Sequence, residues 1–235
     1  MTLRGALVLV VMGCAGVAAY GQDGRLLVAA KGTQSLVIVD PAAGNVIASV
    51  SEGKLPGKDT AHEVAASLDG KLAYLPIYGD SGVGRPGSDG RTMVVIDIAS
   101  QKIVDTIDFG SAYAGAAVRP HLPVMGPPVK GYPDGLLYVT TELEKTITVI
   151  DPKTLKIIGG ISAGQAESHM LAVSHDGKRG YTANVGPGTV SVLDLTPKAD
   201  GSWHNPVAII PVAGTVQRIS VSMYVSLSCG YSYNT

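Results

Sequence analysis

The chain has 235 residues, of which 46% are apolar and 16% charged, and this is enough to bury a core in one or two domains. Its formal net charge of −1 excludes a strongly basic surface for nucleic acid or for an anionic membrane. The 30 glycines, with many Val, Ile, Thr and Tyr residues, indicate short strands and tight turns, and therefore an all-β protein.

Residues 1–21 differ in kind from the rest. Arg4 precedes an apolar run, and small residues stand at the −3 and −1 positions of a cleavage site before Gln22. This pattern is typical of a secretory signal peptide, so we expect an exported protein, periplasmic or extracellular. Two alternatives stay open: a lipoprotein that carries lipid on Cys14, or an uncleaved anchor. Contact with a membrane is expected only through this segment.

A repeated pattern begins after the signal. An apolar run ending in aspartate, followed by a polar turn and another apolar run, recurs along the chain. "HEVAASLDGKLAYLP" (62–76) also aligns with "HMLAVSHDGKRGYTA" (169–183). An Asp-Gly pair between apolar runs is a strong hairpin signal, because Gly accepts the positive φ that the turn needs. Each unit is therefore predicted to contain four antiparallel strands. The recurring strand-end aspartates are Asp40, Asp97, Asp151 and Asp194.

The third predicted strand of each unit is apolar on both faces, as over 36–39 and 94–96. A sheet with one face in water would alternate apolar and polar residues more regularly. Each small sheet is therefore expected to lie between two similar sheets. Four-stranded units that stack in this way describe a β-propeller.

Two stretches carry a resemblance to a known family. "LYVTTELEKTITVIDPKTLKIIG" (137–159) and "GYTANVGPGTVSVLDL" (180–195) resemble the YVTN repeat family of β-propellers. The second strand of that family is spelled here Tyr138-Val139-Thr140-Thr141 and, more loosely, over 181–184. The resemblance covers roughly 22–222. It implies a propeller, in a family made up mostly of uncharacterised exported proteins, with relatives that include lactonase and quinoprotein amine dehydrogenase folds.

About four blades are predicted within 22–222, and the ring does not obviously close. The first unit lacks its own first strand, which a strand at 217–222 would supply if four blades formed a closed ring. An open or partial propeller is favoured, because the resemblance implies about seven blades per turn. The tail over 223–235 departs from the repeat and reads like a chain cut short or read out of frame. An open arc would leave apolar strand edges free for edge-to-edge self-association. The predicted blades span about 22–52, 62–110, 119–164 and 167–214.

Three histidines are the main candidates for a ligand-binding site. His62, His121 and His169 each stand at or near the start of a unit's first strand. In a propeller that strand lines the central channel, so three imidazoles are placed to face one channel mouth, near an anionic ligand or a metal. The alternative is structural: each His bonds backbone or water at the blade rim, and three neighbouring blades hold the rings too far apart for a shared ligand. No metal ligand is assigned, and no cofactor is expected.

Other polar residues have simpler interpretations. The strand-end aspartates are expected to cap turns rather than bind cations. Two insertions, 78–92 and 119–135, form loops on the scaffold, where functional residues are common. Arg85, Arg91 and Arg119 in these loops are candidate anion contacts, with solvated loop cations as the alternative.

Two functions remain. The favoured one is an exported, non-enzymatic propeller that binds a small ligand or another envelope protein through its channel mouth and loops. The alternative is a lactonase-like or quinoprotein-like enzyme with a histidine-lined site. The sequence contains no Gly-x-Ser-x-Gly, His-Glu-x-x-His or Cys-x-x-Cys motif to support a particular chemistry.

Overall fold

The computed structural model describes residues 24–82, 85–212, 214–216 and 218–220. Its regular structure is strand, apart from three short 3-10 turns, and the strands form four separate antiparallel sheets. The prediction of an all-β protein built of small blades is confirmed. The segment predicted to be a signal peptide, both cysteines and the tail over 223–235 lie outside the described residues. No helix in the described part of the chain is long and apolar enough to cross a bilayer.

Blades one and two depart from the regular four strands in opposite ways. Blade one has three strands, as the repeat predicts. Blade two has its first strand broken into two short pieces, β4 and β5, which both pair with β6. Blade one contains β1 (Leu26–Ala30), β2 (Ser35–Asp40) and β3 (Asn45–Ser51). Blade two contains β4 (Thr60–Ala61), β5 (Ala65–Ala66), β6 (Leu72–Gly79), β7 (Asp89–Asp97) and β8 (Lys102–Asp108).

Blades three and four each have four strands, and in both the strands pair in chain order. Blade three contains β9 (Pro120–Met125), β10 (Leu137–Thr141), β11 (Thr146–Asp151) and β12 (Lys156–Ser162). Blade four contains β13 (Ser168–Val173), β14 (Arg179–Asn184), β15 (Thr189–Asp194) and β16 (Ala208–Pro211). Residues 218–220 adopt no regular structure, and the rest of the strand expected at 217–222 lies outside the described residues.

The blades pack face to face through three apolar clusters, one at each boundary between neighbours. Alternate residues of β7 pack at two different boundaries between blades. Val94 packs with Leu36 of blade one, whereas Val95 packs with Val139 of blade three. Each such fully buried side chain contributes about 1.5–3 kcal/mol by leaving water. The two apolar faces read from the sequence are therefore the surfaces that hold the arc together.

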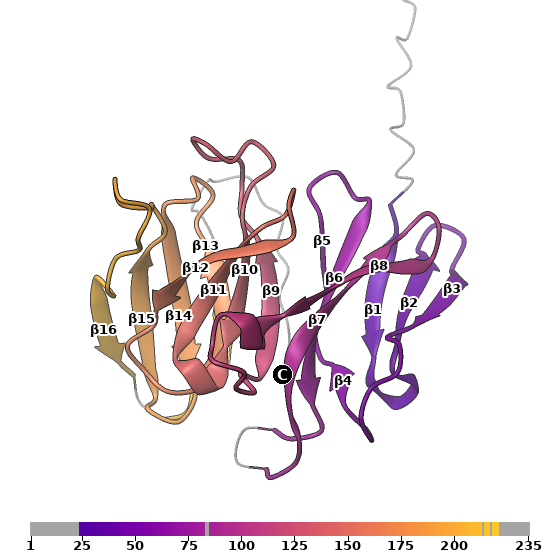
Figure 1. The fold of residues 1–235 in the computed structure, drawn as a ribbon, viewed down its shortest axis with the longest axis horizontal. Coiled ribbons are helices and arrows are strands. Elements are labelled where there is room, and N and C mark those ends of the chain that lie inside the picture. The colour runs from indigo at the N-terminus through magenta and orange to yellow at the C-terminus, as the bar shows by residue number, and fades with distance from the viewer. Residues whose placement is uncertain (1–23, 83–84, 213, 217, 221–235) are drawn as a thin grey trace, which may run out of the picture.

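The four sheets follow one another around an arc, with β3 at one end and β16 at the other (Figure 1). Among the described residues β1 pairs only with β2, and β16 only with β15. The structure is thus a partial propeller of four blades, as expected, rather than a closed four-bladed ring.

The recurring aspartates cap turns at the strand ends. Asp40 Oδ1 accepts hydrogen bonds from the amides of Ala42 and Ala43, each at 3.0 Å. The aspartate of the Asp-Gly turn behaves similarly, since Asp69 Oδ1 accepts the amide of Lys71 at 3.1 Å, and Gly70 takes the predicted positive φ of 70°. The structural interpretation of these carboxylates agrees with the geometry.

Candidate functional site

The three predicted histidines occupy equivalent positions in three successive blades. Each histidine directly follows a residue of its blade's first strand. In all three blades that preceding residue pairs with an equivalent residue near the end of the second strand. Because the blades repeat, this shared register brings each histidine to the inner end of its blade. The preceding residues and their partners are Ala61 with Ile77, Pro120 with Thr141, and Ser168 with Asn184.

The three imidazoles lie together. The ring centroids of His62 and His121 are 5.7 Å apart, and those of His121 and His169 are 4.0 Å apart with nearly parallel planes. These distances contradict the alternative that three blades hold the rings too far apart for a shared ligand. One part of the structural alternative is present, since His121 Nδ1 lies 3.2 Å from the backbone oxygen of His169.

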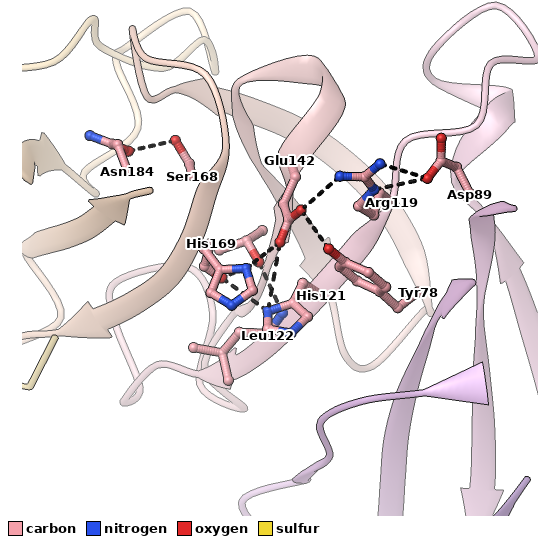
Figure 2. A network of polar contacts seen from close by, with 10 residues as sticks. Tyr78, Asp89, Arg119, His121, Leu122, Glu142, Ser168, His169 and Asn184 are labelled. Atoms are coloured by element: carbon pink, nitrogen blue, oxygen red, sulfur yellow. Dashed lines mark hydrogen bonds and ion pairs between the residues drawn. The ribbon is translucent and has the colours of Figure 1, made fainter. Parts of the chain in front are cut away.

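Neighbouring residues on β13 point in opposite directions, as expected for a strand. Ser168 donates a hydrogen bond to Asn184 Oδ1 within blade four at 2.8 Å, whereas His169 points toward blade three (Figure 2). This pair is therefore not a nucleophile and its base.

A buried carboxylate, which the sequence analysis did not identify, lies at the centre of the site. Glu142 is the first residue of a 3-10 turn, Glu142–Glu144, that directly follows β10. Its side chain is 0% exposed. One oxygen, Oε1, accepts a hydrogen bond from His169 Nδ1 at 2.5 Å. The other, Oε2, accepts the hydroxyl of Tyr78 at 2.9 Å and lies 3.6 Å from Arg119 Nη1 (Figure 2).

A signal for Glu142 was available in the repeat. Glu142 follows Thr141, and the register places Lys31, Tyr78 and Val185 at the same position in the other blades. This position directly follows the second strand of each blade, next to the histidine-bearing first strands. A comparison of the repeats at this position would have identified both Tyr78 and Glu142 as neighbours of the histidines.

The three arginines predicted to lie in loops have different environments. Arg85 lies between β6 and β7, but the prediction is wrong for Arg91, which lies within β7, and Arg119 directly precedes β9. Arg119 is largely buried and pairs with Asp89 at 2.8 Å as well as with Glu142; its guanidinium carbon lies 5.5 Å from the centre of the Tyr78 ring. Arg85 pairs with Asp80 at 3.4 Å, and Arg91 pairs with Asp108 at 2.8 Å, both with exposed side chains. Of the three, Arg119 belongs to the polar network beside the histidines.

Burial keeps two of the histidines and one tyrosine of the site uncharged. Desolvation lowers the pKa of His62 to about 4, and it lowers that of His121 to about 4 as well. Both imidazoles are therefore neutral near pH 7, and each offers one nitrogen lone pair. Burial, the charge of Glu142 and the hydrogen bond to it raise the pKa of Tyr78, so its hydroxyl stays a donor.

A cavity of about 340 Å³ opens beside the histidines, large enough for a small molecule. Its lining combines the three imidazoles and Tyr78 with three charged side chains: Lys31, Glu63 and Arg218. A larger cavity of about 560 Å³ lies near the other end of β6, among the turns that hold Asp69 and Asp134, and no histidine lines it.

Three side chains of the site are also placed to hold a metal ion. His121, Glu142 and His169 each offer one ligand atom, and these atoms lie within 4.8 Å of one another. The arrangement can therefore bind a cation, orient His169 as a base, or present polar groups to a ligand in the cavity.

No protein-family model and no curated protein matches the chain. Solved structures do match in fold. A chain of hydrazine synthase from Kuenenia stuttgartiensis aligns with a TM-score of 0.60 and 18% identity, covering 80% of this chain and 46% of that one. A functionally unknown protein from Desulfotomaculum acetoxidans DSM 771 aligns with a TM-score of 0.60 and 16% identity, covering 81% and 54%.

A chain of the mitotic checkpoint complex aligns with a TM-score of 0.59 and 14% identity, covering 82% of this chain and 48% of that one. The chain thus spans about half the length of the solved structures it matches. At such low identity the likeness concerns the fold alone. The hydrazine synthase and checkpoint-complex chains are of propeller type, and the protein described here has the architecture of a β-propeller.

Proposed function

We propose that the protein is an exported binding protein, and that the cavity at its channel mouth takes a small ligand with at least one negatively charged group. The observation that carries this proposal is the convergence of His62, His121 and His169 on one 340 Å³ cavity. Two cations, Lys31 and Arg218, line the same cavity against a single carboxylate, Glu63. Neutral imidazoles and cationic side chains together favour carboxylate or phosphate groups.

Two parts of the proposal, the family and the export of the protein, rest on the sequence. The Tyr-Val-Thr-Thr strand at 138–141 supports assignment to the YVTN repeat family, and the apolar segment before Gln22 supports export. An exported propeller with a polar channel mouth is suited to capture a small metabolite in the periplasm or outside the cell.

The binding proposal is tested with inorganic phosphate and citrate. Protein and buffers are passed over a chelating resin, and binding is followed by calorimetry and by imidazole resonances in NMR spectra. We expect saturable binding of at least one anion, weakened at least tenfold by His62→Ala and unchanged by His175→Ala, which alters an exposed turn residue. Saturable binding that is equal in both variants would place the ligand elsewhere.

A lactonase-like hydrolase is the second candidate, favoured by the contact between His169 and Glu142. A carboxylate that accepts Nδ1–H of an imidazole at 2.5 Å fixes the ring and leaves Nε2 to act as a general base. A panel of γ- and δ-lactones tests this candidate. Hydrolysis that is abolished by His169→Gln supports an enzyme, and activity that is the same in His169→Gln argues against it.

A partner protein of the cell envelope is the other proposed occupant of the binding face. The insertions over 78–92 and 119–135 both contribute to the site, through Tyr78, Arg119 and His121. A pull-down from envelope extract with wild-type protein and with a variant that shortens the 80–88 connection between β6 and β7 tests this part. A specific partner should be lost with the shortened loop.

A further inference from the structure

His121, Glu142 and His169 form a compact set of ligand atoms at the boundary between blades three and four. One nitrogen of each imidazole and one carboxylate oxygen lie within 4.8 Å of one another. We propose that these three residues bind one divalent transition-metal ion of the zinc class at the channel mouth.

The distances fit a metal after small side-chain movements. His169 Nδ1 lies 2.5 Å from Glu142 Oε1, and His121 Nδ1 lies 4.0 Å from the same oxygen. In a tetrahedral zinc site with bonds of about 2.0–2.2 Å, neighbouring ligand atoms are about 3.3 Å apart. The two separations lie on either side of this value. The metal would take the place of the proton between His169 and Glu142.

The carboxylate is already held in position. Its second oxygen, Oε2, accepts the hydroxyl of Tyr78 at 2.9 Å and faces Arg119 at 3.6 Å, so Oε1 remains directed at the imidazoles (Figure 2). Such outer contacts orient metal ligands and strengthen binding. His121 Nδ1 lies 3.2 Å from the backbone oxygen of His169, and this contact is given up when that nitrogen binds the ion. Both Glu142 and His121 are buried, so little ordering is required when the ion binds.

The local charge also favours a cation. The guanidinium of Arg119 pairs with both Asp89 and Glu142, so two carboxylates share one positive charge. Glu142, with a side chain that is 0% exposed, shares that guanidinium with Asp89, whose side chain is 29% exposed. A buried carboxylate is costly unless a cation or hydrogen-bond donors compensate it, and a metal ion bound at Oε1 would add such compensation.

The donor atoms select the kind of metal. Two imidazole nitrogens and one carboxylate oxygen suit Zn²⁺, Fe²⁺, Ni²⁺ or Cu²⁺, whereas Mg²⁺ and Ca²⁺ prefer oxygen ligands alone. Three protein ligands leave a fourth position open, as in sites where a metal takes up an external ligand. His121 and His169 also line the 340 Å³ cavity, so that position faces the space assigned to the anion. Contact between metal and anion rests on the proposed function, whereas the metal site rests on its own geometry.

The test uses the full chain, stripped of metal on a chelating resin and titrated with Zn²⁺ in calorimetry at pH 7.5. We expect one ion per chain with a Kd of about 1 µM or lower, equivalent to about −8 kcal/mol. His121→Ala and His169→Ala should each weaken binding at least 100-fold. His175→Ala, on an exposed turn, should bind zinc as the wild type does, and excess Mg²⁺ should not compete.

A wild-type chain that binds no zinc stoichiometrically would overturn the proposal. So would a folded His169→Ala variant that binds zinc as tightly as the wild type. Should the alanine variants fail to fold, Co²⁺ absorption of the wild type decides: an intense four- or five-coordinate visible spectrum supports the site, and a weak six-coordinate spectrum overturns it. Anion binding without zinc would uphold the proposed function alone, and zinc binding without any anion would uphold the metal site alone.

Discussion

His169 of blade four donates its Nδ1–H to Glu142 of blade three at 2.5 Å, and this contact crosses the boundary between two separate sheets. The apolar clusters hold the blades together along their faces, whereas this bond ties them at their inner ends. A polar contact in this position fixes the spacing of the channel mouth. Stability and binding are therefore expected to depend on the same few residues.

Removal of the Glu142 carboxylate should destabilise the protein strongly. Glu142→Ala leaves Tyr78 and His169 without their acceptor and Arg119 with one carboxylate fewer, which we expect to cost about 3 kcal/mol of unfolding free energy. Urea denaturation of metal-free protein measures the loss. Glu144→Ala, in the same 3-10 turn, is the matched control and should change the unfolding free energy by less than about 0.5 kcal/mol. Equal losses in the two variants would mean that the network contributes nothing specific.

Two tyrosines of β6 provide a matched comparison of hydroxyl groups. Both are fully buried, but the Tyr78 hydroxyl bonds Glu142, whereas that of Tyr74 has no hydrogen-bond partner among the described residues. Tyr78→Phe should cost about 1–2 kcal/mol because it removes a bond to a charged group. Tyr74→Phe should be neutral or slightly stabilising in the same urea titration. The reverse order would show that the Tyr78–Glu142 bond is not a net stabilising contact.

Acidification should weaken the fold through two buried histidines. His62 and His121 titrate near pH 4 in the folded protein, against an ordinary value of 6.5, because burial disfavours their charged forms. The unfolded chain therefore takes up protons between pH 6.5 and 4 that the folded chain does not, so stability falls as the pH is lowered through this range. We expect a loss of roughly 2–4 kcal/mol between pH 7 and 5; the upper figure is the full linkage of two such groups, and the lower one allows for the partial exposure of His62.

Urea midpoints of metal-free protein at pH 7, 6 and 5 measure this effect. The double variant His62→Asn, His121→Asn should show a flatter profile, whereas His175→Asn, at an exposed site, should match the wild type. A double variant with an unchanged pH profile would assign the acid sensitivity to other groups.

The two ends of the arc expose apolar side chains. Val46 on β3 is 62% exposed, and Ile210 on β16 is 47% exposed. Exposed strands with apolar side chains favour association with other chains. We expect the purified chain to associate as its concentration rises, and Val46→Lys or Ile210→Lys to reduce this association. Light scattering after size exclusion measures it; Val104→Lys, on β8 of a middle blade, is the control. A monomer at every concentration would contradict the expectation.

Much of the fold could be read from the sequence because its causes are local. The Asp-Gly turns depend on a few neighbouring residues, and the apolar runs at Val94 and Val95 already show that a blade must be covered on both faces. The meeting of the three histidines was predictable for a related reason. Equivalent positions in a repeat are carried to equivalent places around an axis.

The repeat could place Tyr78 and Glu142 near the histidines, but the pairing and burial of the site's polar groups were not predictable in this way, because they depend on contacts between distant segments. Tyr78 and Glu142 are 64 residues apart, and Arg119 and Asp89 are 30 apart. Nothing near Glu142 in the sequence distinguishes it from a solvated turn carboxylate, and Arg119 likewise resembled a loop cation exposed to water. Only the approach of neighbouring blades buries both and makes them partners.

By itself, the sequence determined that this chain forms small antiparallel sheets which need similar sheets on either side, because turn chemistry and apolar patterning act over a few residues. Only the tertiary structure decided which polar groups become buried, lose their contacts with water and must hydrogen-bond to one another. That selection depends on the spacing of the blade ends, to within the length of a hydrogen bond, and no local pattern encodes such a distance.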